Sequence, residues 1–530
     1  MVRNWMARWW WLLLLASCAT GGEAYRIRPN EKALAGRDAW LAQPRVTPKQ
    51  KVNVVLIVAD DLGMADTSLY GASGVQTPNL ERLARDGVRY GAGYVTAPLC
   101  SPSRAGLLTG RYQERFGHEG QPHDRYARNR LEFFFARLFL ATDDWRLLTY
   151  RAPDTEDVQR QGIPRSELLL PELLRRAGYA TGMFGKWHLG WSPDFQPQHR
   201  GFDEFTGFYE AFSLYAEPEG RADIVDQHLP EFSDRFIWDK GRTGSAALVR
   251  DGKVVEEPRY LTDVFTDEAI GFIDKHRDEP FFLYLPYQNP HTPFQAKRSD
   301  WDAFPGEKDP IRRTYLALIR SLDTSVGRVL DALDERGLAD DTLVIFVSDN
   351  GAALYTRATT NAPYQGGKFT HFEGGVRVPF AMRWPGRLPA GARYDEPVST
   401  LDVVATIAEA VGLPLPQDRA YDGVDLLPFV RGEKAGPPHQ ALFWRAGYAS
   451  ALRQGPLKLL RDRQSGVTAL FDLGSDAGEK KDVSAARPED VKRLLGELDA
   501  WEAQCVPPLW PAVMDYRFVA SDGREYWYPL

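Results

Sequence analysis

Cysteine is scarce in this chain of 530 residues, which contains only Cys18, Cys100 and Cys505. A fold stabilised by a framework of disulfides needs more cysteines, so that class of secreted protein is excluded. Positive charge is not in excess either, because 65 basic and 72 acidic residues give a formal charge of −7. This balance argues against general affinity for nucleic acid, and an anionic substrate would need a local basic site.

The chain also lacks a long apolar stretch near its amino terminus, where Trp9 to Ala16 is too short to cross a bilayer. Because Arg3 and Arg8 precede this stretch, residues 1–17 are predicted to be a secretory signal. Leu15-Ala16-Ser17-Cys18 is typical of a bacterial lipobox, in which the chain is cut before a cysteine that becomes lipidated. We therefore expect an exported envelope protein, anchored through Cys18 at the outer membrane with residues 18–50 as a tether. A plain signal peptide is the alternative.

Apolar runs rich in Val, Ile, Phe and Tyr alternate with helical stretches over residues 51–435, which predicts a mostly parallel α/β sheet flanked by helices. The expected strands are Asn53–Ala59, Tyr179–Phe184, Phe281–Pro286 and Leu343–Val347, and the expected crossover helices are Thr262–Lys275 and Thr314–Arg336. Residues 436–530 predict a smaller unit with an antiparallel sheet and a packed helix. Its expected elements are strands Ala441–Arg445, Ser450–Arg461 and Ala469–Leu473, followed by a helix over Pro488–Gln504.

Polar residues follow each of the four predicted strands of the large unit. They are Asp60 and Asp61, then Lys186 and His188, then His291, and finally Asp349 and Asn350. The carboxyl ends of parallel strands line one crevice, so we expect these side chains to converge. The oxygen donors Asp60, Asp61, Asp349 and Asn350 are the set that a hard cation such as Ca²⁺ or Mg²⁺ prefers. Helix capping or a solvated turn is the alternative for each acidic pair.

Cys100 stands in the run Cys100-Ser101-Pro102-Ser103-Arg104, just before a helix that we expect to begin near Arg104. Backbone N–H groups at a helix amino terminus favour an oxyanion beside this residue. Two alternatives leave the cysteine unmodified, namely a disulfide with Cys505 and a reactive thiolate.

This run resembles the signature of the type I sulfatases, a family of the alkaline phosphatase superfamily. Other segments resemble the remaining parts of that family's site in the same order. They are VADDLG, GKWHLG, NPHTPF, SDNG and GGKFTHFEGGVRVPF. The resemblance implies that a maturation enzyme, which reads Pro102 and Arg104, oxidises Cys100 to Cα-formylglycine. It also implies an alkaline-phosphatase-like fold.

The resemblance assigns roles to the converging residues. Asp60, Asp61, Asp349 and Asn350 would hold Ca²⁺, with Mg²⁺ as the alternative, together with the oxygen at position 100. Lys186 would bind sulfate, His188 would deprotonate the hemiacetal, and His291 would protonate the leaving alcohol. Lys368 would contact both sulfate and leaving group, and Arg104 would help to balance charge. The nucleophile would be one hydroxyl of the hydrated aldehyde, and the other hydroxyl would later expel sulfate.

The predicted activity is hydrolysis of a sulfate ester on a carbohydrate, with the layout similar to sulfatases acting on galactose or N-acetylgalactosamine sulfates. Two rivals remain, a phosphonate or phosphodiester hydrolase of the same superfamily and a surface glycan-binding protein without activity. Residues 120–166 depart from the shorter members of the family. The Phe and Leu spacing over 131–140 predicts an amphipathic helix that covers the core or walls the substrate cleft.

Overall fold

The computed structural model describes residues 26–48, 51–124, 126–127, 129–140, 142, 144–148 and 152–530. The predicted signal peptide, the lipobox with Cys18 and the first part of the tether lie outside the described residues. No helix within the described ranges is long and apolar enough to cross a membrane.

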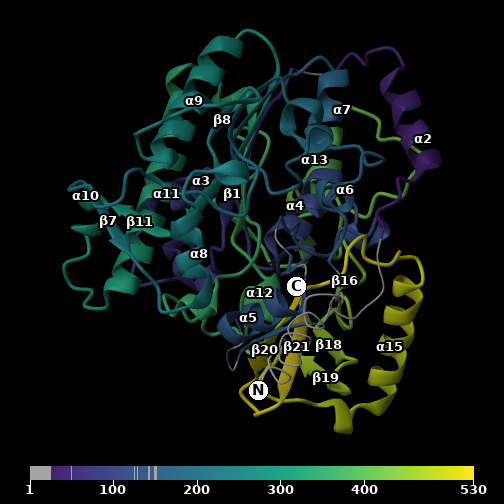
Figure 1. The fold of residues 1–530 in the computed structure, drawn as a ribbon. Coiled ribbons are helices and arrows are strands. Elements are labelled where there is room, and N and C mark those ends of the chain that lie inside the picture. The colour runs from purple at the N-terminus through teal and green to yellow at the C-terminus, as the bar shows by residue number, and fades with distance from the viewer. Residues whose placement is uncertain are drawn as a thin grey trace.

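A sheet of ten strands forms the centre of the fold (Figure 1). From one edge to the other its strands are β14 (Ala392–Tyr394), β2 (Gly87–Tyr90), β13 (Phe380–Arg383), β12 (Thr342–Ser348), β1 (Asn53–Asp60), β10 (Phe281–Pro290), β5 (Ala180–Lys186), β6 (Glu204–Phe208), β8 (Val249–Arg250) and β9 (Lys253–Val254). The five central strands, from β12 to β6, run parallel, whereas β13, β8 and β9 pair in the antiparallel sense. The predicted mostly parallel sheet is confirmed.

Helices cover both faces of this sheet, because alternate side chains of its buried strands point to opposite sides. In β1, Val55 and Ile57 pack toward α3 (Pro78–Arg85), α9 (Leu261–His276) and α11 (Pro310–Glu335). Val54 and Leu56 pack toward the other face, where Figure 1 shows α4, α7 and α13. These three helices are α4 (Cys100–Thr109), α7 (Leu170–Arg176) and α13 (Asp402–Val411). The continuous apolar runs of the sequence therefore reflect burial on two sides.

Each predicted strand and crossover helix of the large unit is present, with ends that shift by a few residues. The expected start of the helix near Arg104 is wrong, because α4 begins at Cys100. Leu99 is extended and precedes the first turn, and Pro102 is the third residue of the helix. A proline fits there because the first N–H groups of a helix have no partner within it. Cys100 therefore belongs to the helix terminus itself.

The carboxyl-terminal unit contains an antiparallel sheet of β16 (Leu442–Ala446), β17 (Ala449–Gln454), β18 (Leu457–Asp462) and β19 (Val467–Asp472), with α15 (Pro488–Glu502) beside it. The single strand expected over Ser450–Arg461 is wrong, because Gly455, with φ of +56°, turns the chain between β17 and β18. The predicted antiparallel sheet with a helix is otherwise confirmed. The domain boundary between residues 435 and 436 stays a prediction.

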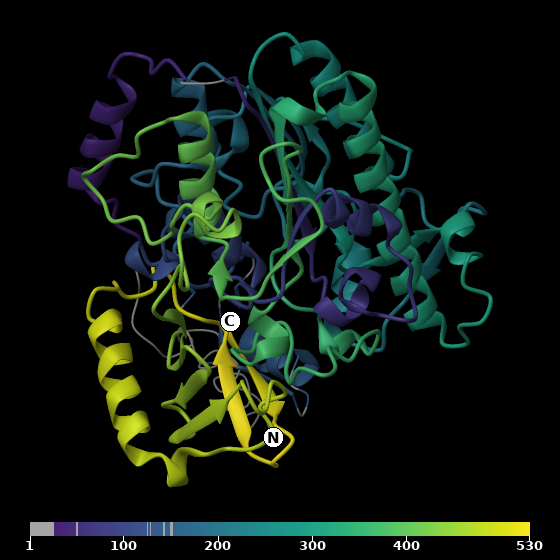
Figure 2. The same cartoon turned by 180° about the vertical axis from the view of Figure 1, so that it is seen from behind.

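A second small sheet was not predicted. It joins β20 (Met514–Val519) and β21 (Glu525–Pro529) to β4 (Trp145–Leu147), which comes from the 120–166 segment. In Figure 2 the yellow strands β20 and β21 lie beside the four-stranded sheet. The same segment forms α5 (Arg130–Leu140), the predicted helix of the insertion.

Part of the predicted tether is attached to the core. Residues 31–41 form α2 (Glu31–Leu41), in which Trp40 is 9% exposed and Arg37 forms an ion pair with Glu172. The remaining elements are α6 (Thr155–Gln159), α8 (Phe232–Lys240), α10 (Arg298–Trp301), α12 (Glu373–Val376) and α14 (Leu427–Val430), and the strand pairs β3 (Gly93–Tyr94) with β15 (Val398–Ser399) and β7 (Ile224–Gln227) with β11 (Phe294–Lys297).

Candidate active site

The polar residues predicted at the strand ends meet at one place. Asp60 is the last residue of β1, and Lys186 is the last residue of β5, with its Nζ 2.6 Å from an Asp60 oxygen. Asp349 follows β12 and accepts a hydrogen bond from the backbone N–H of Asp61 at 3.2 Å. Lys368, which comes from a loop far along the chain, donates to Asp61 at 2.9 Å. The strand polarity of a parallel sheet therefore builds the site.

One group of atoms in this site is suited to a metal ion. One ligand atom from each of Asp60, Asp61, Cys100 and His291 lies within 4.8 Å of all the others. The Cys100 sulfur lies 3.5 Å from an Asp60 oxygen. His291 was not among the predicted ligands, but its Nε2 lies 3.7 Å from Asp61. Asp349 and Asn350 adjoin the group through their hydrogen bonds to Asp61.

Asn350 provides a test of whether these residues fit a cation. Its Nδ2 donates to Asp61 at 2.7 Å, while its Oδ1 is buried and finds no partner within the described residues. The two amide atoms are assigned from the hydrogen-bond network, so the reversed amide would place Oδ1 toward Asp61. An oxygen there beside two carboxylates is a donor set for Ca²⁺ or Mg²⁺. The residues fit the hard cation that the sequence predicts.

Charge in the site is balanced among buried groups. The carboxylates of Asp60, Asp61 and Asp349 face Arg104, Lys186 and Lys368, and all six side chains are at most 4% exposed. Arg104 lies 2.8 Å from Asp349 and 3.7 Å from Asp60. A bound divalent ion would add two positive charges to this balanced set. The site would then attract an anionic substrate, because opposite charges interact strongly where water is excluded.

The carboxyl groups respond differently to this environment. Burial opposes ionisation of Asp61, but Lys368, His291 and Lys186 outweigh it and lower its pKa to about 2. Burial, reinforced by the charge of Asp60, raises the pKa of Asp349 to about 6. A metal ion would favour the ionised form of both groups.

Cys100 is fully buried at the amino terminus of α4. Burial raises the pKa of its thiol well above the usual range, so the unmodified side chain is not a thiolate at neutral pH. The thiolate alternative is therefore disfavoured on physical grounds. Cys100 and Cys505 are both free thiols, so the alternative of a disulfide between them is wrong.

His188 lies in a strained turn two residues after Lys186. Its φ is +59°, and Asp61 and Phe369, the latter next to Lys368, have φ of +63° and +79°. Such backbone costs about 1 to 3 kcal/mol per residue, and it occurs where the surrounding structure holds a functional group in place. Burial and the nearby cations lower the pKa of His188, so its ring is neutral and can accept a proton. Both ring nitrogens are buried without a hydrogen-bond partner in the described residues.

His291 is held by its own neighbour. Its Nδ1 lies 2.6 Å from the carbonyl oxygen of Thr292, so Nδ1 carries the proton and Nε2 offers a lone pair toward Asp61. Burial and then Lys368 lower the pKa of His291 to about 3. The predicted acid role therefore requires the ring to take up a proton when the anionic ester binds.

A cleft of about 530 Å³ leads to this site, with His291 and Lys368 among its lining residues. Of its other walls, the sequence offered only the insertion, as one of two alternatives. They are formed by the insertion (His123, Asp124, Tyr126, Glu132, Ala136, Trp145, Leu147), by residues 210–240 (Glu210, Phe212, Glu231, Phe236, Lys240), by Tyr355 and Phe369, and by the carboxyl-terminal segment (Val513, Met514, Leu530). His123 of the insertion is of a residue type that often takes part in catalysis or binding, but no motif surrounds it in the sequence.

α5 settles the open question about the insertion. Its Leu131, Phe134, Phe135 and Leu138 are 46 to 64% exposed, so the apolar face does not cover the core. Glu132 and Ala136 instead line the cleft. The insertion is a wall of the cleft.

Comparison with known proteins identifies the family. The family model described as Sulfatase matches residues 52–413. The chain belongs to the sulfatase family. It is 34% identical to N-acetylgalactosamine-6-sulfatase of Sus scrofa over 482 residues, which are 84% of each chain, and 32% identical to human steryl-sulfatase over 79% of this chain and 76% of the relative. The structure titled Ps i-CgsB in complex with k-i-k-neocarrahexaose has a TM-score of 0.72 and 33% identity, covering 87% of this chain and 95% of that chain.

This sulfatase is an enzyme that hydrolyses sulfate esters, as the sequence predicted. Sulfatases generally use a formylglycine and a metal ion, and the cluster around Asp60, Asp61, Cys100 and His291 can hold such an ion.

Proposed function

We propose that this sulfatase removes sulfate from a sulfated carbohydrate, with a formylglycine formed from Cys100 and Ca²⁺ as the bound ion. The observation that carries the proposal is the position of Cys100. It lies fully buried at a helix amino terminus, 3.5 Å from Asp60, within a cluster of three carboxylates and three cations at the end of the cleft. This is a setting for an oxygen nucleophile beside a metal and an anion.

Each charged side chain then has a defined task. The ion, held by Asp60, Asp61, Asp349 and Asn350, would polarise sulfate oxygens, and the formylglycine would supply the attacking oxygen. Lys186 is paired with Asp60 and Lys368 with Asp61. Because the ion would bind these two carboxylates, both lysines could then donate hydrogen bonds to the sulfate.

The two histidines share the proton transfers, and Arg104 positions a carboxylate of the site. Neutral His188 accepts a proton from position 100, and His291 delivers one to the leaving oxygen. Arg104 holds Asp349 in place through its Nε and Nη2.

A carbohydrate leaving group is supported by the cleft and by the relatives. About 530 Å³ is within the range of small-molecule sites and accommodates a sugar residue with part of its neighbour. Glu210, Asp124 and Lys240 form a polar cluster in the wall, with Lys240 2.6 Å from Glu210 and 3.0 Å from Asp124. Buried polar groups of this kind bind hydroxyls, and the aromatic rings nearby suit the faces of sugars. Similar proteins include one titled with a neocarrahexaose and one named for N-acetylgalactosamine.

Maturation and location complete the proposal. A formylglycine-generating enzyme would act on Cys100 before folding closes the site, since the residue is fully buried afterwards. Export with a lipid on Cys18 would place the enzyme in the bacterial envelope. Incorporation of a labelled fatty acid into the wild type but not into Cys18→Ser would support the anchor, and equal labelling of the two would refute it.

The decisive test examines the peptide that contains position 100. Mass spectrometry of active protein should show the loss of mass expected for conversion of a thiol to an aldehyde, and protein made without a maturation enzyme should fold but release no sulfate. Active protein with an intact thiol would overturn the proposal.

Substrate comparisons separate the rivals. Sulfate release from a sulfated galactoside should far exceed cleavage of a phosphonate monoester or a phosphodiester. The reverse order would favour the phosphoryl rival, and binding of glycan without any turnover by fully converted protein would favour the glycan-binding one.

A further inference from the structure

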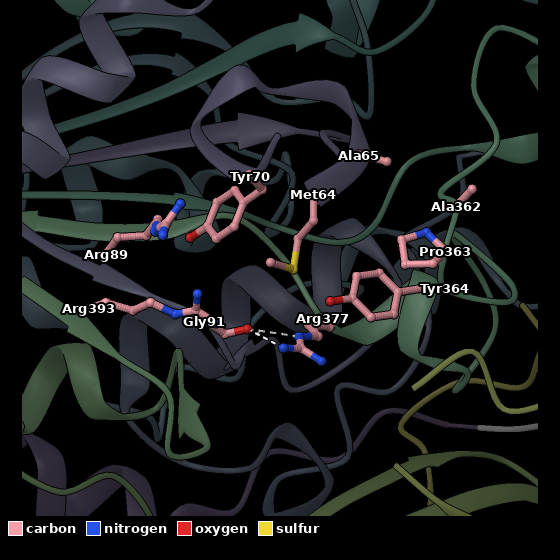
Figure 3. Close-up of a pocket in the computed structure, with 10 residues that line it drawn as sticks. All are labelled: Met64, Ala65, Tyr70, Arg89, Gly91, Ala362, Pro363, Tyr364, Arg377 and Arg393. Atoms are coloured by element: carbon pink, nitrogen blue, oxygen red, sulfur yellow. Dashed lines mark hydrogen bonds between the residues drawn. The ribbon is translucent and has the colours of Figure 1, made fainter. Parts of the chain in front are cut away.

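A separate pocket of about 260 Å³ lies on the molecule, and none of the predicted site residues lines it. We call it the arginine pocket. Its lining residues are Met64, Ala65, Tyr70, Arg89, Gly91, Ala362, Pro363, Tyr364, Arg377 and Arg393. Figure 3 shows the three arginines around one space, with Met64 and Tyr364 across from Arg89 and Arg393.

Two of these arginines are directly paired across neighbouring strands. Arg89 of β2 is the register partner of Arg393 of β14, and the two strands run parallel. Register partners on adjacent strands project from the same face of the sheet, so their like charges repel. Arg377, which follows α12, adds a third guanidinium to the same pocket. This arrangement lowers stability unless negative charge is supplied.

The protein itself supplies little of that charge. Arg393 donates to Asp395 at 2.7 Å, but this pair is 61% and 59% exposed and therefore weak. Arg377 lies 3.4 Å from Glu373, which is shared with Lys458 at 2.8 Å.

Arg89 is the least compensated of the three. It donates to the carbonyl oxygen of Leu69 at 2.6 Å, and in the part of the chain that the structure describes it forms no ion pair. The pocket thus carries net positive charge.

The guanidinium groups are also held in position. Arg377 donates through Nε to the carbonyl oxygen of Gly91 at 3.0 Å and lies 4.8 Å from the ring centre of Tyr364. Arg89 lies 5.7 Å from the ring centre of Tyr70. Arg89 and Arg393 keep N–H donors that these contacts do not use. Fixed guanidinium groups with spare donors bind tetrahedral oxyanions through paired hydrogen bonds.

We propose that the arginine pocket is a second anion site, distinct from the catalytic cluster, that binds a sulfate group. The group belongs either to inorganic sulfate or to a second sulfate on the same saccharide. The pocket is connected to the active site along the chain. Met64 lies three residues after Asp61 and Tyr364 lies four residues before Lys368, so an anion there contacts both segments that carry these residues.

Calorimetric titration with sodium sulfate, at ionic strength held constant with chloride, tests the site itself. The full-length wild type, Arg89→Gln and Arg393→Gln are compared with the control Arg387→Gln, which changes an exposed arginine outside the pocket. We expect the pocket variants to lose one class of sulfate site, with affinity falling about tenfold or more because a charge-assisted hydrogen bond is removed. The control should titrate like the wild type. Identical titrations of all four proteins would overturn the proposal.

Kinetics distinguish the two sources of sulfate. If the bound group belongs to the substrate, the pocket variants raise KM for a disulfated oligosaccharide and leave KM for its monosulfated form unchanged. If it is inorganic sulfate, both KM values stay unchanged while the calorimetric site is still lost. Arg393→Gln changes an exposed side chain and should fold normally. If it loses the sulfate site as Arg89→Gln does, misfolding of Arg89→Gln does not explain the loss. The calorimetric result does not depend on turnover, so it stands or fails separately from the proposed hydrolytic function.

Discussion

The two ends of the active site are built in different ways. The sulfate end combines side chains at the ends of β1, β5, β10 and β12 with Arg104 of α4 and Lys368 of a loop, and ion pairs of 2.6 to 2.9 Å hold these buried groups. The leaving-group end is an open cleft formed by an insertion, by residues 210–240 and by the carboxyl-terminal hairpin. The parallel sheet fixes the chemistry, and segments added around it determine what the sulfate is attached to.

The largest effect expected from this contrast is at Cys100. Cys100→Ala removes the proposed precursor of the nucleophile, so sulfate release should fall to background, a loss of about 10⁶ by comparison with other nucleophilic enzymes. The alanine is smaller and apolar, so the fold should persist, as circular dichroism would show. Cys505→Ala is the matched control and should retain full activity. Substantial turnover by Cys100→Ala would place the nucleophile elsewhere.

A smaller loss is expected at the edge of the sulfate end. Lys368→Ala removes a buried donor to sulfate and should lower kcat by about 10² to 10³, or about 3 to 4 kcal/mol. Because Lys368 is proposed to contact the sulfate and the leaving oxygen, which every sulfate ester has, an aryl sulfate and a sulfated sugar should both lose rate. Lys275→Ala, at an exposed lysine, provides the comparison. Near-normal kcat for Lys368→Ala would remove this residue from the mechanism.

The difference between the two ends also explains what the sequence could predict. Asp60, Lys186, His291 and Asp349 each follow a buried apolar run, and strand polarity alone requires that such residues meet. The cleft offers no comparable rule. β4 pairs with β20 across more than 360 residues, as in the contact of Trp145 with Tyr516, and neither short strand has a distinctive pattern. Tertiary packing selects such partners, and local sequence does not encode them.

α5 illustrates the same limit. Its apolar spacing predicted a helix correctly, but spacing cannot tell which body the apolar face meets. Phe134 and Leu138 are exposed, and the opposite residue Glu132 lines the cleft. The helix starting at Cys100 is a related case, since Pro102 indicates a first turn without fixing its first residue.

The cleft itself can be tested at His123. Its Nε2 is buried without a partner in the described residues, and burial lowers its pKa, so the neutral ring is available to a substrate hydroxyl. His123→Ala should reduce kcat/KM for a sulfated sugar about tenfold, by loss of one hydrogen bond, and change the rate on a small aryl sulfate less than about twofold. His276→Ala, on α9, is the control. Equal losses on both substrates would show that His123 serves the sulfate end.

The smallest effect concerns how the carboxyl-terminal unit is joined to the segment that carries Lys368. Lys458 of β18 lies 2.8 Å from Glu373, which follows Lys368 closely in the chain, and 3.0 Å from Glu479. Burial, with the charge of Glu373 adding to it, raises the pKa of Glu479 to about 7 against the opposing effect of Lys458. The folded protein therefore keeps a proton on Glu479 that the unfolded chain releases at its ordinary pKa near 4.5.

This retained proton gives a pH dependence of stability with a definite sign. The stabilisation from Glu479 is complete below about pH 4.5 and is lost as the pH rises through about 7. Between these values the folded state still binds a proton that the unfolded chain has released, so each rise in pH favours the unfolded chain. Glu479→Gln cannot titrate, so its Tm should change less than that of the wild type between pH 4.5 and 8. Glu489→Gln, at an exposed residue of α15, should follow the wild type. If the profiles of the wild type and Glu479→Gln were parallel, the buried group of Glu373, Lys458 and Glu479 would not control this junction, and apolar packing alone would hold the two parts together.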